Sequence, residues 1–155
     1  MQLDTVVQDT TNDLINFLKV DRVVLYHFYA EWEGRVTFES LSDQKFSILG
    51  STGPDECFNG EYAGMYSRGR VSAIADIEDA DIAPCHRDFL RSLSVRANLV
   101  VPILPQGTQV DPSETLWGLL VAHHCQSARH WSAKDRERMQ QGAEMLAMAS
   151  SIKKR

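Results

Sequence analysis

The apolar positions at the start of the chain recur with the 3.6-residue period of an amphipathic helix. They are Leu3, Val6, Val7, Leu14, Ile15 and Leu18. Two runs rich in β-branched and aromatic residues follow at 22–30 and 35–42, as is typical of strands. The segment between them ends in Gly34, which we expect to supply the positive φ of a tight hairpin.

The middle of the chain has a mixed pattern. Residues 43–59 contain two glycines and a proline, so we expect a long irregular segment, and long loops in compact domains are often functional. A short helix over 61–69, closed by Gly69, should lead into a strand over 70–75. A second short helix is expected over 85–93, directly after Pro84.

The last third predicts two strands, at 97–104 and 115–125, joined by a polar loop. A final helix over 132–155 should begin at Ser132, because serine is a preferred N-cap. The order of elements predicts an α+β domain, in which a central antiparallel sheet is flanked by helices on both faces. A length of 155 residues suits one such domain over 1–155.

Charge and hydropathy narrow the class of protein. The net charge of −5 and the absence of a basic stripe argue against nucleic acid as a partner. The start of the chain lacks the basic and apolar pattern of a secretory signal. No stretch approaches the roughly 18 apolar residues that a membrane span needs. We therefore expect a cytoplasmic protein with no membrane partner for this domain.

The three cysteines are odd in number, and without an export signal we expect reduced thiols and no structural disulfide. Cys125 ends an apolar strand and is typical of a small buried residue. Cys85 lies near a helix N-terminus beside His86, which favours the thiolate, so a reactive and a structural role both stay open. Cys57 lies beside Asp55 and another acid, and nothing local marks it as reactive.

Metal and catalytic motifs are missing from the sequence. His123 and His124 are adjacent on a predicted strand and would point to opposite faces, so they do not favour a shared zinc ion. No CxxC, HExxH, GxSxG, GxGxxG or P-loop pattern occurs. The sequence predicts neither a metal site nor a turnover enzyme.

Two long stretches change this picture when they are considered together. They are "GRVSAIADIEDADIAPCHRDFLRSLSVRANLVVPIL" at 69–104 and "LWGLLVAHHCQSARHW" at 116–131. They closely resemble the bilin-binding GAF domains of cyanobacteriochromes, the small phytochrome-related photoreceptors of cyanobacteria. In addition, "DECF" at 55–58 resembles the Asp-Xaa-Cys-Phe motif of the dual-cysteine subfamily. The resemblance covers nearly the whole chain.

The resemblance implies covalent chemistry for two cysteines. Cys85 matches the thiol that forms a permanent thioether with ring A of the bilin. Cys57 matches a reversible thiol that adds to the methine bridge between rings B and C, which shortens the conjugated system and gives a violet-to-blue-absorbing state.

It also implies a set of residues around the chromophore. His86 resembles the residue packed against the tetrapyrrole, and His123, six residues after Trp117, resembles the histidine near ring D. Asp55 resembles the acid that binds pyrrole nitrogens. Phe58 completes the motif, and Tyr66 resembles a pocket tyrosine.

Four arginines are candidates for the bilin propionates, since guanidinium binds carboxylates bidentately: Arg68, Arg70, Arg87 and Arg96. The segment around Tyr66 differs from the family's usual basic pattern, so the sequence does not choose between them. Trp32 and Trp131 are expected in packing.

The family also implies a function. Phycocyanobilin would be the chromophore, in part isomerised to phycoviolobilin, and light would convert a violet- or blue-absorbing Z state into a green- to orange-absorbing E state. The last helix would lead to an output signalling domain in cis and could also form a homodimer. The alternative is a GAF domain that regulates by binding a cyclic nucleotide or another small ligand without a covalent bond.

Overall fold

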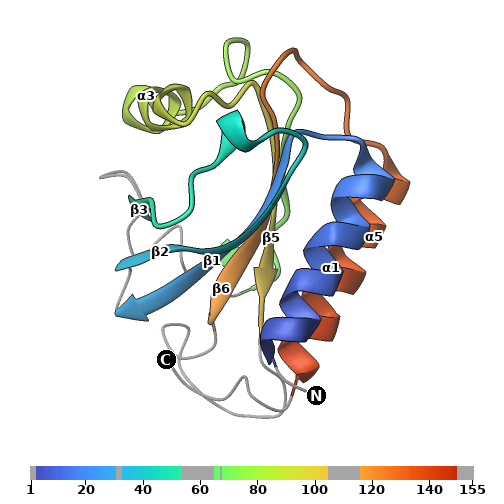
Figure 1. The fold of residues 1–155 in the computed structure, drawn as a ribbon. Helices are drawn as coiled ribbons and strands as arrows, with labels where there is room; N and C mark the ends of the chain where they lie inside the picture. The colour runs from blue at the N-terminus through green and yellow to red at the C-terminus, as the bar shows by residue number, and fades with distance from the viewer. Residues whose placement is uncertain (1–2, 31–32, 54–64, 67, 105–115, 150–155) are drawn as a thin grey trace.

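The structure is a computed structural model that describes residues 3–30, 33–53, 65–66, 68–104 and 116–149. Most of its helices and strands are labelled in Figure 1. Along the chain, the helices and strands are α1 (Leu3–Leu18), β1 (Arg22–Ala30), β2 (Glu33–Leu41), the 3-10 helix η1 (Gln44–Phe46), β3 (Thr52–Gly53), β4 (Ser72–Ile74), α3 (Pro84–Ser92), β5 (Ala97–Ile103), β6 (Gly118–His124) and α5 (Ala133–Met148).

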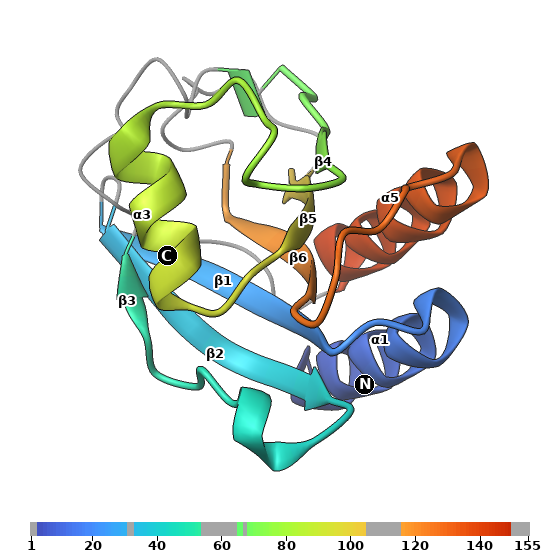
Figure 2. The same ribbon diagram turned by 90° about the horizontal axis from the view of Figure 1, so that it is seen from above.

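The described strands form one six-stranded sheet in the order β3-β2-β1-β6-β5-β4. Every pair of neighbouring strands is antiparallel. Helices α1 and α5 lie side by side on one face of this sheet, and α3 crosses the other face (Figures 1 and 2). The predicted α+β class, with an antiparallel sheet flanked by helices on both faces, is confirmed.

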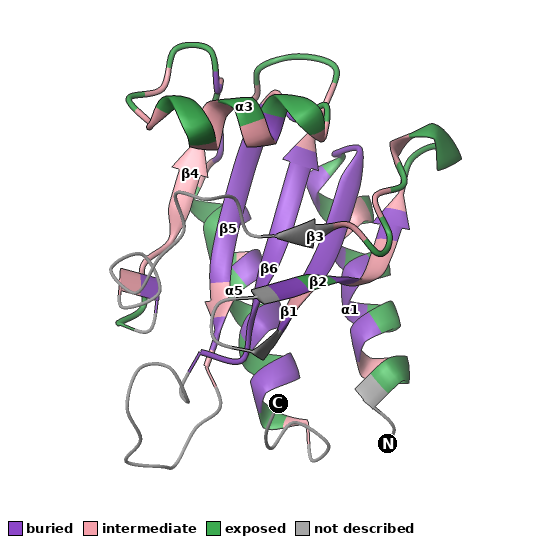
Figure 3. Ribbon diagram, turned by 90° about the vertical axis from the view of Figure 1, so that its left-hand side faces the viewer, coloured by how far each residue is buried: buried purple, intermediate pink, exposed green. Residues whose placement is uncertain are grey.

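Alternation along the strands divides the apolar residues between the two faces, because successive side chains point in opposite directions. Leu99 and Leu120 belong to the larger core, which packs against α1 and α5. Val100 and Val121, one residue further along, belong to a second cluster on the face of α3. The central strands are therefore buried on both sides (Figure 3).

Helix α5 begins as predicted. Ser132 accepts a hydrogen bond from the Asp135 backbone, and the Asp135 carboxylate accepts one from the Ser132 backbone, which completes a capping box. Arg129 bridges this carboxylate to the carbonyl oxygen of Leu18, so the start of α5 is tied to the end of α1. These interactions lower the pKa of Asp135, although its burial acts in the opposite direction.

The helix ends earlier than the sequence suggests. Ala149 is already extended, with φ −63° and ψ 133°, so α5 stops at Met148 and does not continue over the expected range of 132–155. Residues 150–155 lie outside the described part of the chain. The length of a helix in a protein depends mainly on how far its apolar face packs against the rest of the fold. Helix-forming residues in the sequence do not show where this packing ends.

The prediction for Gly34 is wrong. Gly34 has no positive φ; it lies inside β2 opposite Phe28. A Cβ atom there would lie 2.5 Å from the carbonyl oxygen of His27 and 2.7 Å from Tyr26 Cε1. Close approach between β1 and β2 requires this glycine, whereas Gly69 does have a positive φ, of 97°.

The segment over 43–59 is more ordered than predicted where it is described. Residues 44–46 form η1 and residues 52–53 form β3, which pairs with β2 and is itself one edge of the sheet. The Asp43 side chain caps η1 by accepting a hydrogen bond from the Lys45 backbone. The remaining strands and α3 lie within three residues of their predicted ranges.

Substitutions of two glycines separate steric from conformational requirements. Because backbone atoms block a Cβ at Gly34, we expect Gly34→Ala to lower the free energy of unfolding by about 1–3 kcal/mol, and Gly34→Asn by at least as much. At Gly50, with φ 86° and open space around it, asparagine should be tolerated better than alanine. Urea unfolding of the four variants measures this. A milder effect of asparagine than of alanine at Gly34 would contradict the steric account.

Candidate functional site

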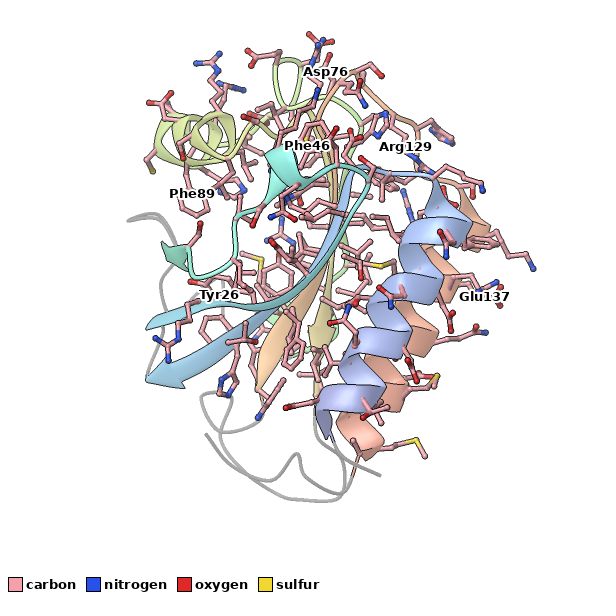
Figure 4. The ribbon with its side chains drawn as sticks, viewed as in Figure 1. Tyr26, Phe46, Asp76, Phe89, Arg129 and Glu137 are labelled. Carbon is pink, nitrogen blue, oxygen red and sulfur yellow. The ribbon has the colours of Figure 1, made fainter. Side chains whose placement is uncertain are left out.

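Two cavities open on the face of the sheet that α3 covers. The larger, of about 670 Å³, lies between Tyr66 and residues 70–83, and the smaller, of about 100 Å³, lies between α3 and the sheet. Tyr66 and His86 line both. The larger volume lies within the range of roughly 300–1,000 Å³ that is usual for small-molecule sites. Figure 4 shows Phe89 of α3 and Tyr26 of β1 on this same side of the sheet.

Helix α3 carries two of the predicted site residues. Pro84 starts the helix, and it is preceded by Ala83 in an extended conformation, so Cys85 and His86 lie in the first turn. The Arg87 side chain holds the preceding loop by donating hydrogen bonds to the carbonyl oxygens of Ile77 and Ala80. Cys85 is exposed and His86 is half-buried.

Cys85 is disulfide-bonded in the structure, which corrects the expectation that all cysteines are reduced. Composition and compartment indicate the redox tendency of a chain, but they do not show which sulfur atoms approach one another in the fold. Cys125, in contrast, is free and half-buried, and burial raises the pKa of its thiol. The expected role of Cys125 as a packing residue agrees with this environment.

His123 of β6 lines the smaller cavity and is hydrogen-bonded to Arg22 of β1. Arg22 is almost fully buried, and it donates from Nε to the carbonyl oxygen of Phe46 (2.7 Å) and from Nη1 to Nδ1 of His123 (2.9 Å). His123 lines the cavity and has a pKa well below its usual value, first because it is buried and second because Arg22 is cationic. His123 is therefore neutral near pH 7.

Asn98 lines the same cavity. It is 3% exposed, and its Oδ1 has no hydrogen-bond partner among the described residues. Sequence reasoning missed both Asn98 and Arg22. The only signal available was a polar residue at the start of each of two apolar strand runs, Arg22 in "RVVLYHF" and Asn98 in "ANLVVPIL".

Each of the four arginine candidates has a different environment. Arg96 binds Asp76 through two hydrogen bonds of 2.7 and 2.9 Å, which lower the pKa of Asp76 to about 2. Arg87 is occupied with the loop carbonyls described above. Arg70 lines the larger cavity, and its guanidinium lies 5.4 Å from the centre of the Tyr66 ring. Arg68 is exposed.

Other predicted residues can be placed as follows. Tyr66 is buried in the apolar cluster on the α3 face and lines both cavities. Trp131 is in packing, as expected, with its Nε1 donating to the carbonyl oxygen of Ile74. His124 Nδ1 lies 3.4 Å from a carboxylate oxygen of Asp21. Asp55, Cys57, Phe58 and Trp32 lie outside the described residues.

The described part of the chain contains no group of three or more histidine, cysteine or acidic side chains that could hold a metal ion. None of the helices described here is long and apolar enough to cross a membrane.

Comparisons with known proteins agree with the geometry. A family profile described as GAF domain matches residues 2–149. The crystal structure of the blue-light-absorbing form of the PixJ GAF domain from Thermosynechococcus elongatus superposes with a TM-score of 0.82 at 30% identity, over 94% of this chain and 82% of that one. A phycocyanobilin-bound GAF domain from a cyanobacterial phytochrome gives 0.81 at 28% identity, over 96% and 84%.

A longer relative is also similar in sequence. A putative methyl-accepting chemotaxis protein of Synechocystis is 42% identical over 74% of this chain, but the match spans only 11% of that protein. This chain belongs to the GAF domain family, and its structure is closely similar to the photoreceptor GAF domains of cyanobacteriochromes.

Proposed function

We propose that this chain, over 1–155, is a photosensory GAF domain of the dual-cysteine subfamily that binds a linear tetrapyrrole covalently and changes colour in light. The observation that carries the proposal is the cleft beside α3, where His86 and Tyr66 line both cavities and Cys85 lies one residue away in the same helical turn. The phycocyanobilin-bound GAF domain of similar fold supports phycocyanobilin as the chromophore. Its isomer phycoviolobilin is part of the proposal through the family resemblance alone.

The residues present fit such a ligand. An extended conjugated molecule needs an apolar surface, and the smaller cavity supplies Val24, Val100, Leu119 and Val121 from the sheet. The polar parts of the ligand need partners, and the unpartnered Oδ1 of Asn98 can accept a hydrogen bond from it. Arg70 is a cation on the wall of the larger cavity and is the candidate for a propionate.

Cys85 performs the attachment in this proposal. Its thiolate forms a C–S bond with the ring A side chain, and a proton is taken up at the neighbouring carbon, so the addition needs no oxidant. Because Cys85 is disulfide-bonded in the structure, this disulfide must first be cleaved by exchange with a thiol reductant, which is itself oxidised to a disulfide. A cytoplasmic location, where thiols are kept reduced, is consistent with this requirement.

Cys57 performs the reversible step. Its thiol adds to the methine bridge between rings B and C, which gives the violet- or blue-absorbing Z state, and its departure gives the green- to orange-absorbing E state. The pigment supplies light absorption and the Z-to-E rotation. Asp55, Phe58, His86 and His123 hold it in place, and the chain carries out no turnover chemistry beyond attachment and pigment isomerisation.

Signalling would pass through the helices on the opposite face. The chemotaxis relative supports an output domain elsewhere in a longer protein, because the match covers only a small part of it. The exposed side chains of Phe17 on α1 and Met145 on α5 are consistent with a homodimer through these helices.

The test of the proposed function is to express the chain together with the enzymes of phycocyanobilin synthesis. We expect a coloured protein whose pigment survives denaturing electrophoresis and whose violet-to-blue band falls on illumination with blue light while a longer-wavelength band rises. A colourless protein from cells that contain free phycocyanobilin would contradict the proposal and leave the non-covalent GAF regulator in its place.

Attachment should depend on one cysteine. We expect Cys85→Ala to lose pigment on denaturation, because the reacting carbon then has no thiol beside it, whereas Cys125→Ala should keep it. The measurement is pigment fluorescence in the protein band after denaturing electrophoresis under reducing conditions. Full retention of pigment by Cys85→Ala would rule out the assigned attachment site.

Asp55 and His86 should affect different properties of the bound pigment, its colour and its attachment. Asp55→Ala is expected to shift the absorption band while attachment continues, because it removes a hydrogen-bond acceptor for pyrrole nitrogens. His86→Ala is expected to reduce the attached fraction several-fold, because His86 lines both cavities beside Cys85. Asp88→Ala, on the exposed side of the same helix, is the control. Loss of attachment in Asp55→Ala alone would contradict both roles.

Cys57 should control colour and not attachment. We expect Cys57→Ala to keep its pigment through Cys85 and to lack the violet-to-blue band in the dark, because conjugation is then never interrupted. Iodoacetamide should block recovery of that band in the wild type more readily after illumination than in the dark, when the thiol is bonded. The measurement is the absorption spectrum of wild type and of Cys57→Ala in the dark. An unchanged blue band in Cys57→Ala would show that Cys57 is not a second linkage.

A further inference from the structure

Three polar side chains form a row across the central strands of the sheet. In the strand register, Arg22 of β1 lies directly opposite His123 of β6, and His123 lies directly opposite Asn98 of β5. Side chains that are directly opposite in antiparallel strands point to the same face, with Cβ atoms about 4.5–5.5 Å apart. The row therefore lies on the face of α3, at the floor of the smaller cavity, which both His123 and Asn98 line.

The contact with Arg22 fixes which nitrogen of His123 carries the proton. A guanidinium has only hydrogen-bond donors, so Nδ1 of His123 must accept the 2.9 Å bond from Arg22. A protonated imidazole has no acceptor and would place a second cation beside the first. His123 is thus the neutral tautomer with its proton on Nε2, and this N–H is a donor available to the cavity.

Asn98, beside His123, supplies a hydrogen-bond acceptor. Its Oδ1 is an acceptor that is buried and lacks a partner among the described residues. Buried polar atoms in native proteins almost always have a hydrogen-bond partner, so a buried acceptor that lines a cavity indicates a donor on the ligand. Neither a carboxylate nor an aromatic face supplies such a donor.

The resemblance already implies that His123 lies near ring D, one of the two terminal lactam rings. We propose that Asn98 supplies the matching acceptor beside it, so that the two side chains bind the lactam end as a pair, and that Arg22 positions this pair by holding the tautomer of His123. A lactam presents an N–H beside a C=O on one edge, which complements an acceptor beside a donor. Asn98 accepts from the lactam N–H and His123 Nε2 donates to the lactam oxygen. This inference rests on the proposed function, but its first test needs no pigment.

The first test is the tautomer of His123 in the pigment-free chain, measured by two-dimensional ¹⁵N NMR of histidine-labelled protein. We expect a neutral ring protonated at Nε2, retained in Arg22→Lys, which keeps a donor, and exchanging between tautomers in Arg22→Met. An Nδ1-protonated or doubly protonated His123 in the wild-type chain near pH 7 would overturn the role of Arg22, even if Arg22→Met fails to fold.

The second test measures ligand binding in the Cys85→Ala chain, where phycocyanobilin binds without a bond to Cys85. Asn98→Leu has a similar volume without the acceptor, and we expect the Kd to rise on the order of 10-fold, the loss typical of one hydrogen bond. Asn98→Ser keeps an acceptor and should recover part of the affinity. In the absence of pigment, Asn98→Leu should unfold at the same or a higher urea concentration, because it removes an unpartnered polar group.

A third arm identifies the part of the ligand that Asn98 binds. Phycocyanobilin dimethyl ester has no propionate charge but keeps both lactams, so the loss in Asn98→Leu should be the same for ester and acid. A loss that disappears with the ester would assign Asn98 to a propionate and overturn the proposal, as would equal affinity of Asn98→Leu and its parent. A wild-type chain that binds no phycocyanobilin would overturn the proposed function instead.

Discussion

The arrangement of this molecule depends on a sheet whose central strands are apolar on both faces. Along β1 and β6, the side chains that point to either face are buried. Val23 and Leu120 lie on one face, and Val24 and Val121 lie on the other. Both faces of such a sheet must be covered, because leaving an apolar side chain exposed costs about 1.5–3 kcal/mol relative to burying it. Helices α1 and α5 pack on one face over β1, β2, β5 and β6, whereas cavities remain beside α3 on the other.

The partly covered face is where the polar row of Arg22, His123 and Asn98 lies. Burying a guanidinium costs several kcal/mol unless its donors are matched, and here bonds to Phe46 and His123 match two of them. An amide oxygen left unpartnered in the same place costs a further 1–3 kcal/mol or so. A core built only for stability would replace this row with valines, as the neighbouring positions do. The same residues are useful to a ligand that has both donors and acceptors.

Much of the fold could be predicted from the sequence because its strands and helices follow clear periods. The first helix and β1 have the predicted bounds, and Ser132 caps α5 as expected. Gly34 could not be predicted, because its role depends on the approach of β1, a tertiary contact that turn rules do not contain. For the same reason the end of α5 and the disulfide at Cys85 were missed.

The candidate site was only partly accessible from the sequence. The resemblance located Cys85, His86, Tyr66 and His123, and the last three line the cavities. Arg22 and Asn98 carry no motif. Their connection to His123 arises from strand register, which joins residues about 25 and 100 positions apart in the chain and is visible only in the folded sheet.

The most direct test of this account is a crystal structure of the chain expressed with phycocyanobilin. We predict a tetrapyrrole between α3 and the sheet, joined to Cys85, with one lactam within hydrogen-bond distance of His123 Nε2 and Asn98 Oδ1. A pigment bound on the face of α1 and α5, or one whose lactam ends both lie away from the polar row, would contradict the account.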